Sequence, residues 1–130
     1  MEKILLIHPD LVLREELTFV LQHSGFQVAH VIEGWQALAE IYRGCPDLVV
    51  MFESCHRLNG DELCVRIRAI CQTPIIVLGQ DYEEAAGIEF LEMGADAYLA
   101  SPLNPRELLA WIRSLLRRAK GNPKDYEKRE

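Results

Sequence analysis

The sequence predicts an α/β domain in which helices cover both faces of one open, doubly wound, five-stranded parallel sheet. Short, continuous apolar segments alternate five times with longer segments whose apolar residues recur at helical spacing. The connections between them are short. Successive strands joined through a helix run parallel, and such a sheet is buried on both faces. The length of 130 residues suits one three-layer domain of this kind.

The first two strand–helix repeats occupy the first third of the chain. The run KILLI suits a strand buried on both faces. The next apolar residues, from Leu13 to Leu21, recur at helical spacing, and Gly25 follows as a helix stop. A second apolar segment and a second periodic segment precede Arg43-Gly44. The expected elements are, in order, a strand at Lys3–Ile7, a helix at Asp10–Ser24, a strand at Phe26–Val31 and a helix at Glu33–Tyr42.

The remaining three repeats begin with a continuous apolar run that ends at Phe52. Apolar residues at helical spacing follow between Leu63 and Ile70, and Gly94 stops the next helix. Asn104-Pro105 is a typical helix start, with a capping side chain and proline in the first turn. The expected strands are Leu48–Phe52, Ile75–Leu78 and Ala97–Ala100. Each is followed by an expected helix, at Gly60–Ile70, Tyr82–Met93 and Asn104–Ala119 respectively.

Charge is unevenly distributed along the chain. The net charge is −6, but residues 117–130 carry six basic and three acidic side chains, so the remainder carries −9. A body this acidic is not expected to bind nucleic acid, and a short basic end is typical of a solvated linker. We therefore divide the chain into a domain at 1–119 and a polar tail or linker at 120–130.

Membrane and disulfide signals are weak. No apolar run is long enough to span a bilayer or follows a basic leader, so we expect a cytoplasmic protein without membrane contact. The cysteines form no CxxC motif and no recognised zinc-ligand spacing. We expect reduced thiols that pack as small apolar side chains at Cys45, Cys55, Cys64 and Cys71.

Function is expected at the carboxyl ends of the strands, where open α/β sheets bind their ligands. Those ends read His8-Pro9, Phe52-Glu53, Leu78-Gly79 and Ala100-Ser101. No glycine-rich phosphate loop follows the first strand, and no GxSxG motif occurs. Metal-assisted phosphoryl transfer needs acidic ligands at the first and third strand ends and a cation beside them, whereas the ends offer an imidazole, a proline, a phenyl ring, no side chain and one hydroxyl. We therefore expect no enzymatic activity, no cofactor and no metal.

Five motifs occur in a fixed order along residues 3–119. They are KILLI, PDLVVM followed by Asn59-Gly60, TPIIVL, LEMGADAYL, and Pro102 with PRELLAWIRSLLRR. Together they resemble the receiver domain of bacterial two-component response regulators. The resemblance implies a flavodoxin-like, chemotaxis-type (βα)5 fold with strand order 2-1-3-4-5. The closing helix is most similar to receivers of the winged-helix transcription factors.

The resemblance also implies where phosphorylation chemistry should lie. In that family an acidic pair follows the first strand, and here those positions hold His8 and Pro9. The aspartate that accepts a phosphoryl group ends the third strand. Its place is taken by Phe52, as the distance to Asn59-Gly60 fixes.

The two other chemical positions have changed as well. The Thr or Ser that ends the fourth strand in that family corresponds to Gly79. The lysine that precedes a proline, typically through a cis bond, corresponds to Ser101 before Pro102. All five chemical positions therefore depart from the family pattern, and the scaffold around them does not.

Neighbouring residues offer little replacement chemistry. Strand residues alternate between faces, so Glu53 should point away from the acceptor position. Asp10 reads as the N-cap of the first helix, and one carboxylate is a weak magnesium site. His8 could be a ligand or phospho-carrier, although a lone histidine beside proline more often lines a pocket. A phenyl ring at position 52 would contribute about 1.5–3 kcal/mol of apolar burial.

The resemblance implies an interaction face on the fourth helix, fifth strand and fifth helix. In transcription-factor receivers this face forms a symmetric dimer through charge pairs, and an aromatic switch residue corresponds to Tyr98. Other polar candidates that remain are Asp96, Glu107 and Arg113. Three positions that commonly hold paired charged residues in that family hold uncharged ones here, namely Gly87, Ala97 and Trp111. Trp111 either anchors a partner or packs across the sheet edge, and Trp35 is a second surface candidate.

An emptied site on an intact scaffold leads to the hypothesis of a phosphorylation-independent pseudo-receiver. It would act as a homodimerisation or protein-interaction module, in the N-terminal part of a DNA-binding transcriptional regulator. Two alternatives stay open. One is a receiver phosphorylated on a non-standard residue, namely Glu53, Asp10 or His8. The other is a pocket at the changed positions that senses a small molecule or thiol redox state.

Overall fold

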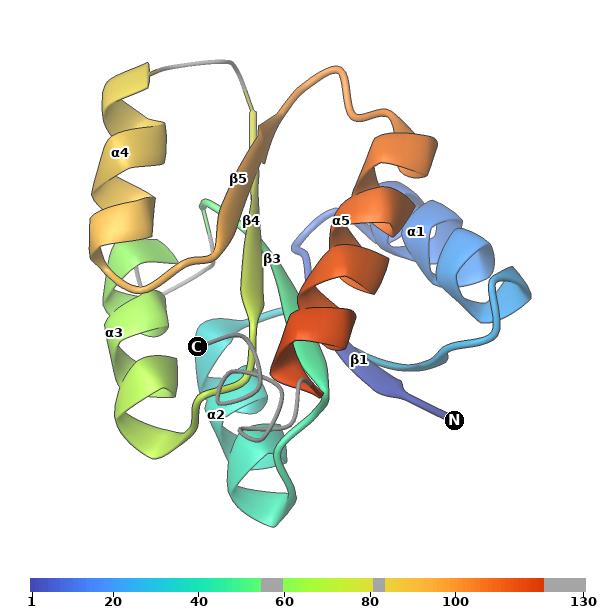
Figure 1. Cartoon of the computed structure of the whole chain (residues 1–130), viewed down its shortest axis with the longest axis horizontal. Coiled ribbons are helices and arrows are strands. Elements are labelled where there is room, and N and C mark those ends of the chain that lie inside the picture. Colours follow the sequence, from blue (N-terminus) through green and yellow to red (C-terminus); the bar gives the residue numbers. More distant parts are fainter. Residues whose placement is uncertain (55–59, 81–83, 121–130) are drawn as a thin grey trace, which may run out of the picture.

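The computed structural model describes residues 1–54, 60–80 and 84–120. Its strands form a single parallel sheet in the order β2-β1-β3-β4-β5, as predicted (Figure 1). The strands are β1 (Lys3–Ile7), β2 (Gln27–Val31), β3 (Leu48–Phe52), β4 (Ile75–Gly79) and β5 (Ala97–Ala100). The helices are α1 (Leu11–His23), α2 (Gly34–Arg43), α3 (Gly60–Ile70), α4 (Glu84–Glu92) and α5 (Pro105–Ala119). The predicted boundaries agree with these to within two residues.

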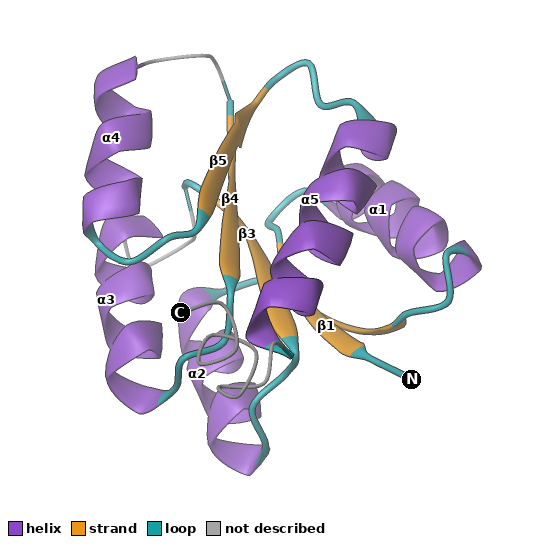
Figure 2. Cartoon of the chain, viewed as in Figure 1, coloured by secondary structure: helices purple, strands orange, loops and turns teal. Residues whose placement is uncertain are grey.

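The sheet separates two apolar layers, which Figure 2 shows as helices on either side of the strands. Alternate strand residues such as Leu6 and Val50 pack with α1 and α5. Their neighbours, such as Leu5 and Met51, pack with α2, α3 and α4. Because strand side chains alternate, one apolar run supplies both layers, which explains the continuous apolar segments.

The helix ends are set by local signals in the sequence. Asp10 caps α1 by accepting from the Leu13 backbone N–H at 3.1 Å, which confirms its expected capping role. Asn104 caps α5 in the same way through Arg106 at 2.9 Å. Gly25 and Gly94 follow α1 and α4 with φ of 95° and 114°, a conformation that favours glycine.

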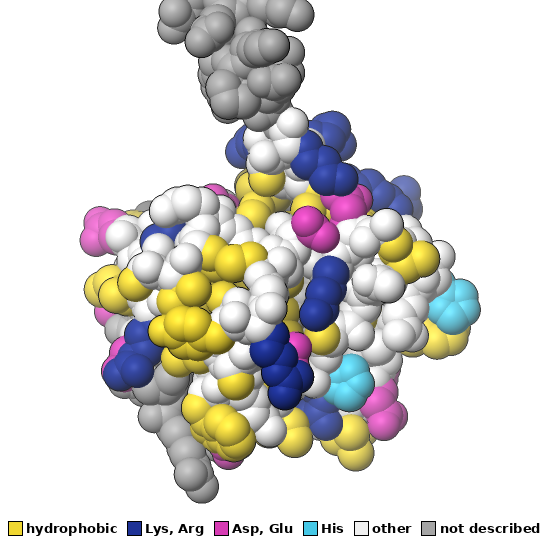
Figure 3. Space-filling view, turned by 90° about the horizontal axis from the view of Figure 1, so that it is seen from below, with side chains coloured by type: hydrophobic (Ala, Val, Ile, Leu, Met, Phe, Trp, Pro, Cys, Tyr) yellow, Lys and Arg dark blue, Asp and Glu magenta, His cyan; other side chains and the backbone are white. Residues whose placement is uncertain are grey.

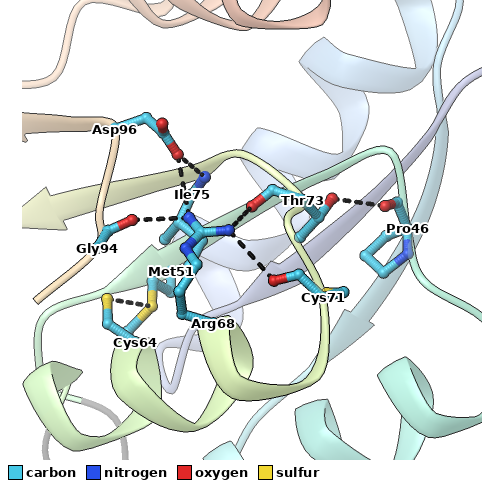
Figure 4. Close-up of polar contacts among 9 residues, drawn as sticks. All are labelled: Pro46, Met51, Cys64, Arg68, Cys71, Thr73, Ile75, Gly94 and Asp96. Atoms are coloured by element: carbon cyan, nitrogen blue, oxygen red, sulfur yellow. Dashed lines mark hydrogen bonds and ion pairs between the residues drawn. The ribbon is translucent and has the colours of Figure 1, made fainter. Parts of the chain in front are cut away.

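Arg68 ties the end of α3 to the loop before β5 (Figure 4). Its guanidinium donates to the carbonyl oxygens of Thr73 and Gly94, both at 2.7 Å, and to that of Cys71 at 3.3 Å. It also contacts Asp96 Oδ2 at 3.3 Å. These contacts satisfy carbonyl groups at the amino end of the sheet and fix the edge strand β5.

The strand register gathers the carboxyl ends at one edge. Ile7 pairs with Met51, so His8 and Phe52 are neighbours. Phe52 pairs with Leu78, and Gly79 pairs with Ala100. The opposite edge, seen in Figure 3, carries side chains of both charge signs interspersed with apolar ones.

The remaining expectations concern membrane contact and residues that lie outside the described ranges. Within the described residues, no helix is long and apolar enough to cross a membrane. The tail at 121–130, Cys55, Asn59 and the predicted start of the fourth helix at Tyr82 lie outside the described residues.

Candidate functional site

Two rings occupy the centre of the carboxyl edge. His8 is 3% exposed, and its imidazole lies 4.6 Å from the Phe52 ring, centroid to centroid, with the planes tilted by 31°. Phe52 packs against the apolar layer formed with α1 and α5. The two positions where the family implies acidic chemistry are therefore joined by ring packing.

Hydrogen bonds fix the orientation of His8. Its Nδ1 accepts from the Asp10 backbone N–H at 3.0 Å, and its carbonyl accepts from the buried Arg14 guanidinium at 2.9 Å. Because Nδ1 accepts, a neutral ring carries its proton on Nε2. Burial lowers the pKa of His8, the nearby Asp10 charge raises it, and Arg14 lowers it further, with a net downward direction.

A cavity of about 270 Å³ lies beside these rings, between α1, the ends of β4 and β5, and the start of α5. Its wall is mostly apolar. The lining residues are His8, Leu13, Glu16, Leu17, Val20, Phe52, Leu78, Gly79, Leu99, Ser101, Leu103 and Pro105. Four of the five changed chemical positions thus border one space.

The Tyr98 ring occupies the space that a side chain at position 79 would fill. A Cβ built on Gly79 would overlap the Tyr98 hydroxyl and Cζ and would lie 3.0 Å from Cε2. The hydroxyl donates to Glu53 Oε2 at 3.0 Å, and Glu53 Oε1 accepts from the Gln80 N–H at 3.0 Å. The Tyr98 ring also stacks on Phe90, with centroids 5.8 Å apart.

Glu53 therefore has a structural role that sequence reasoning missed. Strand alternation does turn it away from Phe52, as predicted, but it meets Tyr98 there. We name Glu53, Gly79 and Tyr98 the tyrosine latch. The signal in the sequence would have been an acidic residue and a glycine at the ends of strands that flank an aromatic position.

Ser101, which follows β5, also lies at the carboxyl edge of the sheet. The backbone N–H of Ser101 donates to the Gly79 carbonyl at 3.2 Å, and its hydroxyl donates to the same oxygen at 3.3 Å. The Ser101–Pro102 peptide bond is cis, as the resemblance implies. Pro9 is half-buried beside His8. In the described part of the chain, no three His, Cys, Asp or Glu side chains are grouped to hold a metal ion.

The residues named for an interaction face have different surroundings. Glu107 and Arg113 are exposed on α5, and Trp111 is half-buried and packs against the core. The Asp96 carboxylate accepts from the Ile75 N–H at 2.8 Å and contacts Arg68. Ala97 is buried.

Trp35 and the three described cysteines, Cys45, Cys64 and Cys71, do not line the cavity. Trp35 is exposed on α2 and donates to Glu33. The Cys64 thiol packs on the Met51 sulfur at 3.7 Å. A hydrogen bond with Cys71 raises the pKa of the exposed Cys45 thiol, which makes it a poorer nucleophile at neutral pH.

Comparison with known proteins identifies the family. The sequence model described as "Response regulator receiver domain" matches residues 4–113. The chain belongs to this family. It is the receiver domain of a two-component response regulator.

Relatives of this receiver include DNA-binding regulators. It is 36% identical over 122 residues to the DNA-binding response regulator MtrA of Mycobacterium tuberculosis, covering 94% of this chain and 54% of MtrA. It is 34% identical over 122 residues to the sensory transduction protein RegX3 of Mycolicibacterium smegmatis, with the same coverage of each chain. The chain spans about half the length of these curated relatives.

Solved receiver structures share the fold. A two-component response regulator from Clostridium difficile superposes with a TM-score of 0.89 at 27% identity, over 93% of this chain and all of that one. The BeF3-activated receiver domain of RstA from Klebsiella pneumoniae gives 0.84 at 30% identity, over 88% of this chain and 98% of that one.

Proposed function

We propose that this receiver works without phosphorylation of a side chain at its carboxyl edge. The observation that carries the proposal is the packing of Phe52 on the buried His8 ring. An acyl phosphate needs a carboxylate nucleophile, and a divalent cation needs oxygen ligands beside it. A phenyl ring and a neutral imidazole supply neither.

The alternative acceptors are already engaged, which supports the same proposal. Both Glu53 carboxylate oxygens accept hydrogen bonds, Asp10 caps α1, and His8 Nδ1 accepts from the backbone. Phosphorylation of either Glu53 oxygen would break a contact that stabilises the edge, and the Asp10 carboxylate and the His8 ring are held in their orientations by the contacts they already make. The phosphorylated-receiver alternative therefore has less support.

Two measurements test the proposal. Beryllofluoride with Mg²⁺ is added to the isotope-labelled domain, with the RstA receiver as the positive control because it is described as BeF3-activated. We expect no saturable chemical-shift changes at Phe52, Gly79 or Ser101. Incubation with acetyl phosphate should leave the intact mass unchanged. Saturable shifts, or a mass gain of one phosphoryl group, would refute the proposal.

We further propose that the domain is an interaction module of a DNA-binding transcriptional regulator that continues beyond this segment. The support is the likeness to MtrA, a DNA-binding response regulator of which the match covers only 54%. The domain itself would contact protein rather than nucleic acid, because residues 1–116 carry −9. A test is the oligomeric state and promoter binding of the full gene product, which should be insensitive to phosphoryl donors.

The contact surface we propose is the face of α4, β5 and α5, forming a homodimer. β5 is an edge strand, and Ile88 and Leu91 on α4 are 51% and 49% exposed. Because Asp96 already bonds within its own chain, apolar side chains should contribute more than an Asp96–Arg113 pair. Sedimentation should show a dimer that Ile88→Arg weakens. Val65→Arg, 48% exposed on α3, is the matched control, and equal effects would refute the choice of face.

A further inference from the structure

The cavity beside His8 has the size of a small-molecule site. Its volume of about 270 Å³ exceeds the ~150 Å³ cavity that holds benzene in an engineered protein interior. It lies close to the lower end of the ~300–1,000 Å³ range of ligand pockets. A molecule of one or two rings therefore fits.

The wall is apolar except at three points. Leucine side chains from α1, β4 and β5 line most of it, together with the Phe52 ring. Ser101 lies at one side, where its hydroxyl already donates to a backbone carbonyl. Glu16 lies on the exposed side of α1. The third point is the imidazole of His8.

His8 offers one hydrogen-bond donor, Nε2–H, to a ligand in the cavity. Nδ1 accepts from the Asp10 N–H, so the proton of the neutral ring is on Nε2. Among the described residues, the hydrogen bonds of His8 involve Nδ1 and the backbone and not Nε2, and the ring lines the cavity. A ligand in the cavity that accepts from Nε2–H therefore gains one net hydrogen bond.

The charge around the cavity selects against anions. Burial disfavours the imidazolium form of His8, and the Glu16 carboxylate lies on the wall. Neither group would stabilise a carboxylate or phosphate within an apolar pocket.

We propose that this cavity binds a small, uncharged, largely apolar molecule whose single oxygen acceptor takes a hydrogen bond from His8 Nε2–H. The molecule would occupy the edge where the family implies a phosphoryl group and a metal ion. The proposal goes beyond the proposed function, because a phosphorylation-independent receiver needs no ligand.

The test compares three probes of similar size by NMR titration of leucine methyl groups and of the His8 ring nitrogens, without any phosphoryl donor. Acetophenone is neutral and carries one acceptor, ethylbenzene lacks the acceptor, and benzoate is anionic. We expect saturable shifts at Leu17, Leu78 and Leu99 with acetophenone, and a shift of the Nε2 resonance. Ethylbenzene should bind about fivefold more weakly, as one net hydrogen bond implies. Benzoate should bind weakest.

Variants separate the site from the surface. Val20→Phe fills the cavity from α1 and should abolish the shifts, whereas Val12→Phe, 61% exposed on the same helix and outside the cavity, should leave them unchanged. His8→Phe should equalise acetophenone and ethylbenzene. If that variant does not fold, the probe ratio on the unaltered protein still decides. Absence of saturation, equal binding of the two neutral probes to the unaltered protein, or equal shifts in both valine variants would overturn the proposal.

Discussion

Replacing Gly79 by alanine should force the tyrosine latch open. The new Cβ would overlap the Tyr98 hydroxyl and Cζ, so the ring has to move. Gly79 does not have positive φ, so alanine adds no backbone strain there. Apart from the change in entropy of the unfolded chain, the effect of the substitution therefore reports on the Tyr98 ring.

The magnitude follows from the contacts that are lost. A hydrogen bond to a charged group such as the Glu53 carboxylate contributes about 1.5–3 kcal/mol. Weaker stacking of Tyr98 on Phe90 costs up to about 1 kcal/mol more. The lower entropy of the unfolded alanine chain offsets about 0.4–1 kcal/mol. We expect the free energy of unfolding to fall by about 1–3 kcal/mol.

The assay is urea unfolding, in which the midpoint should fall and the slope should stay constant. Gly44→Ala is the matched control, because no atom lies within 4 Å of a Cβ built on Gly44. That variant should be neutral or slightly more stable. NMR of labelled tyrosine rings should show a changed environment for Tyr98 in Gly79→Ala and not in Gly44→Ala.

A double-mutant cycle isolates the clash. In a Tyr98→Leu background the ring is gone, so Gly79→Ala should be neutral or stabilise by up to about 1 kcal/mol through the unfolded chain, and the interaction energy should be about 1.5–4 kcal/mol. If Gly79→Ala costs the same in both backgrounds, or matches Gly44→Ala, then Tyr98 does not occupy the space at Gly79 and the reasoning fails.

Three further predictions concern separate residues. Phe52→Asp places a carboxylate at the acceptor position without the cation ligands beside it, so acetyl phosphate should add no mass to the variant. Its free energy of unfolding, measured in urea, should fall by about 1–3 kcal/mol because a partly buried ring is lost. A phosphorylated product would contradict this prediction. Arg68→Met should cost about 2–4 kcal/mol in the same assay against about 0.5 kcal/mol for Arg66→Met, whose exposed ion pair is weak, and similar losses would contradict the role of Arg68. Because its folded pKa lies below the usual 6.5, His8 binds protons more readily in the unfolded chain, so stability should decrease as pH falls below about 6.5 and level off below the folded pKa. Stability measured against pH should lose this component in His8→Gln and keep it in His30→Gln, and an unchanged His8→Gln profile would disagree.

Sequence reasoning reaches the fold because its signals are local. Continuous apolar runs mark strands, Asp10 and Asn104 mark helix starts, and Gly25 and Gly94 mark helix ends. Each depends on residues within one turn or strand of each other. The strand order came from the family resemblance, since periodicity alone does not specify which strands are neighbours.

The same reasoning predicts only part of the site. The family positions identify Phe52 and His8 but not the contact between their rings, and strand alternation places Glu53 on the correct face without naming its partner. The Glu53–Tyr98 bond joins residues 45 positions apart and depends on an atom that Gly79 lacks. The cavity likewise results from how α1 and α5 meet the sheet, which no single segment encodes.

The changes at the carboxyl edge support one another physically. The Tyr98 hydroxyl fills the space at Gly79 only while that residue lacks a side chain, and the hydroxyl needs an acceptor on the same face. Glu53 provides it because residue 52 turns to the opposite face, where Phe52 packs on His8. A bond of about 1.5–3 kcal/mol biases the tyrosine toward this position by roughly ten- to 150-fold. A signal that acts through Tyr98 must supply at least that free energy as differential binding. A partner at the α4–β5–α5 face or a ligand in the cavity can supply it by binding the two arrangements unequally, and a phosphoryl group has no carboxylate at position 52 through which to do so.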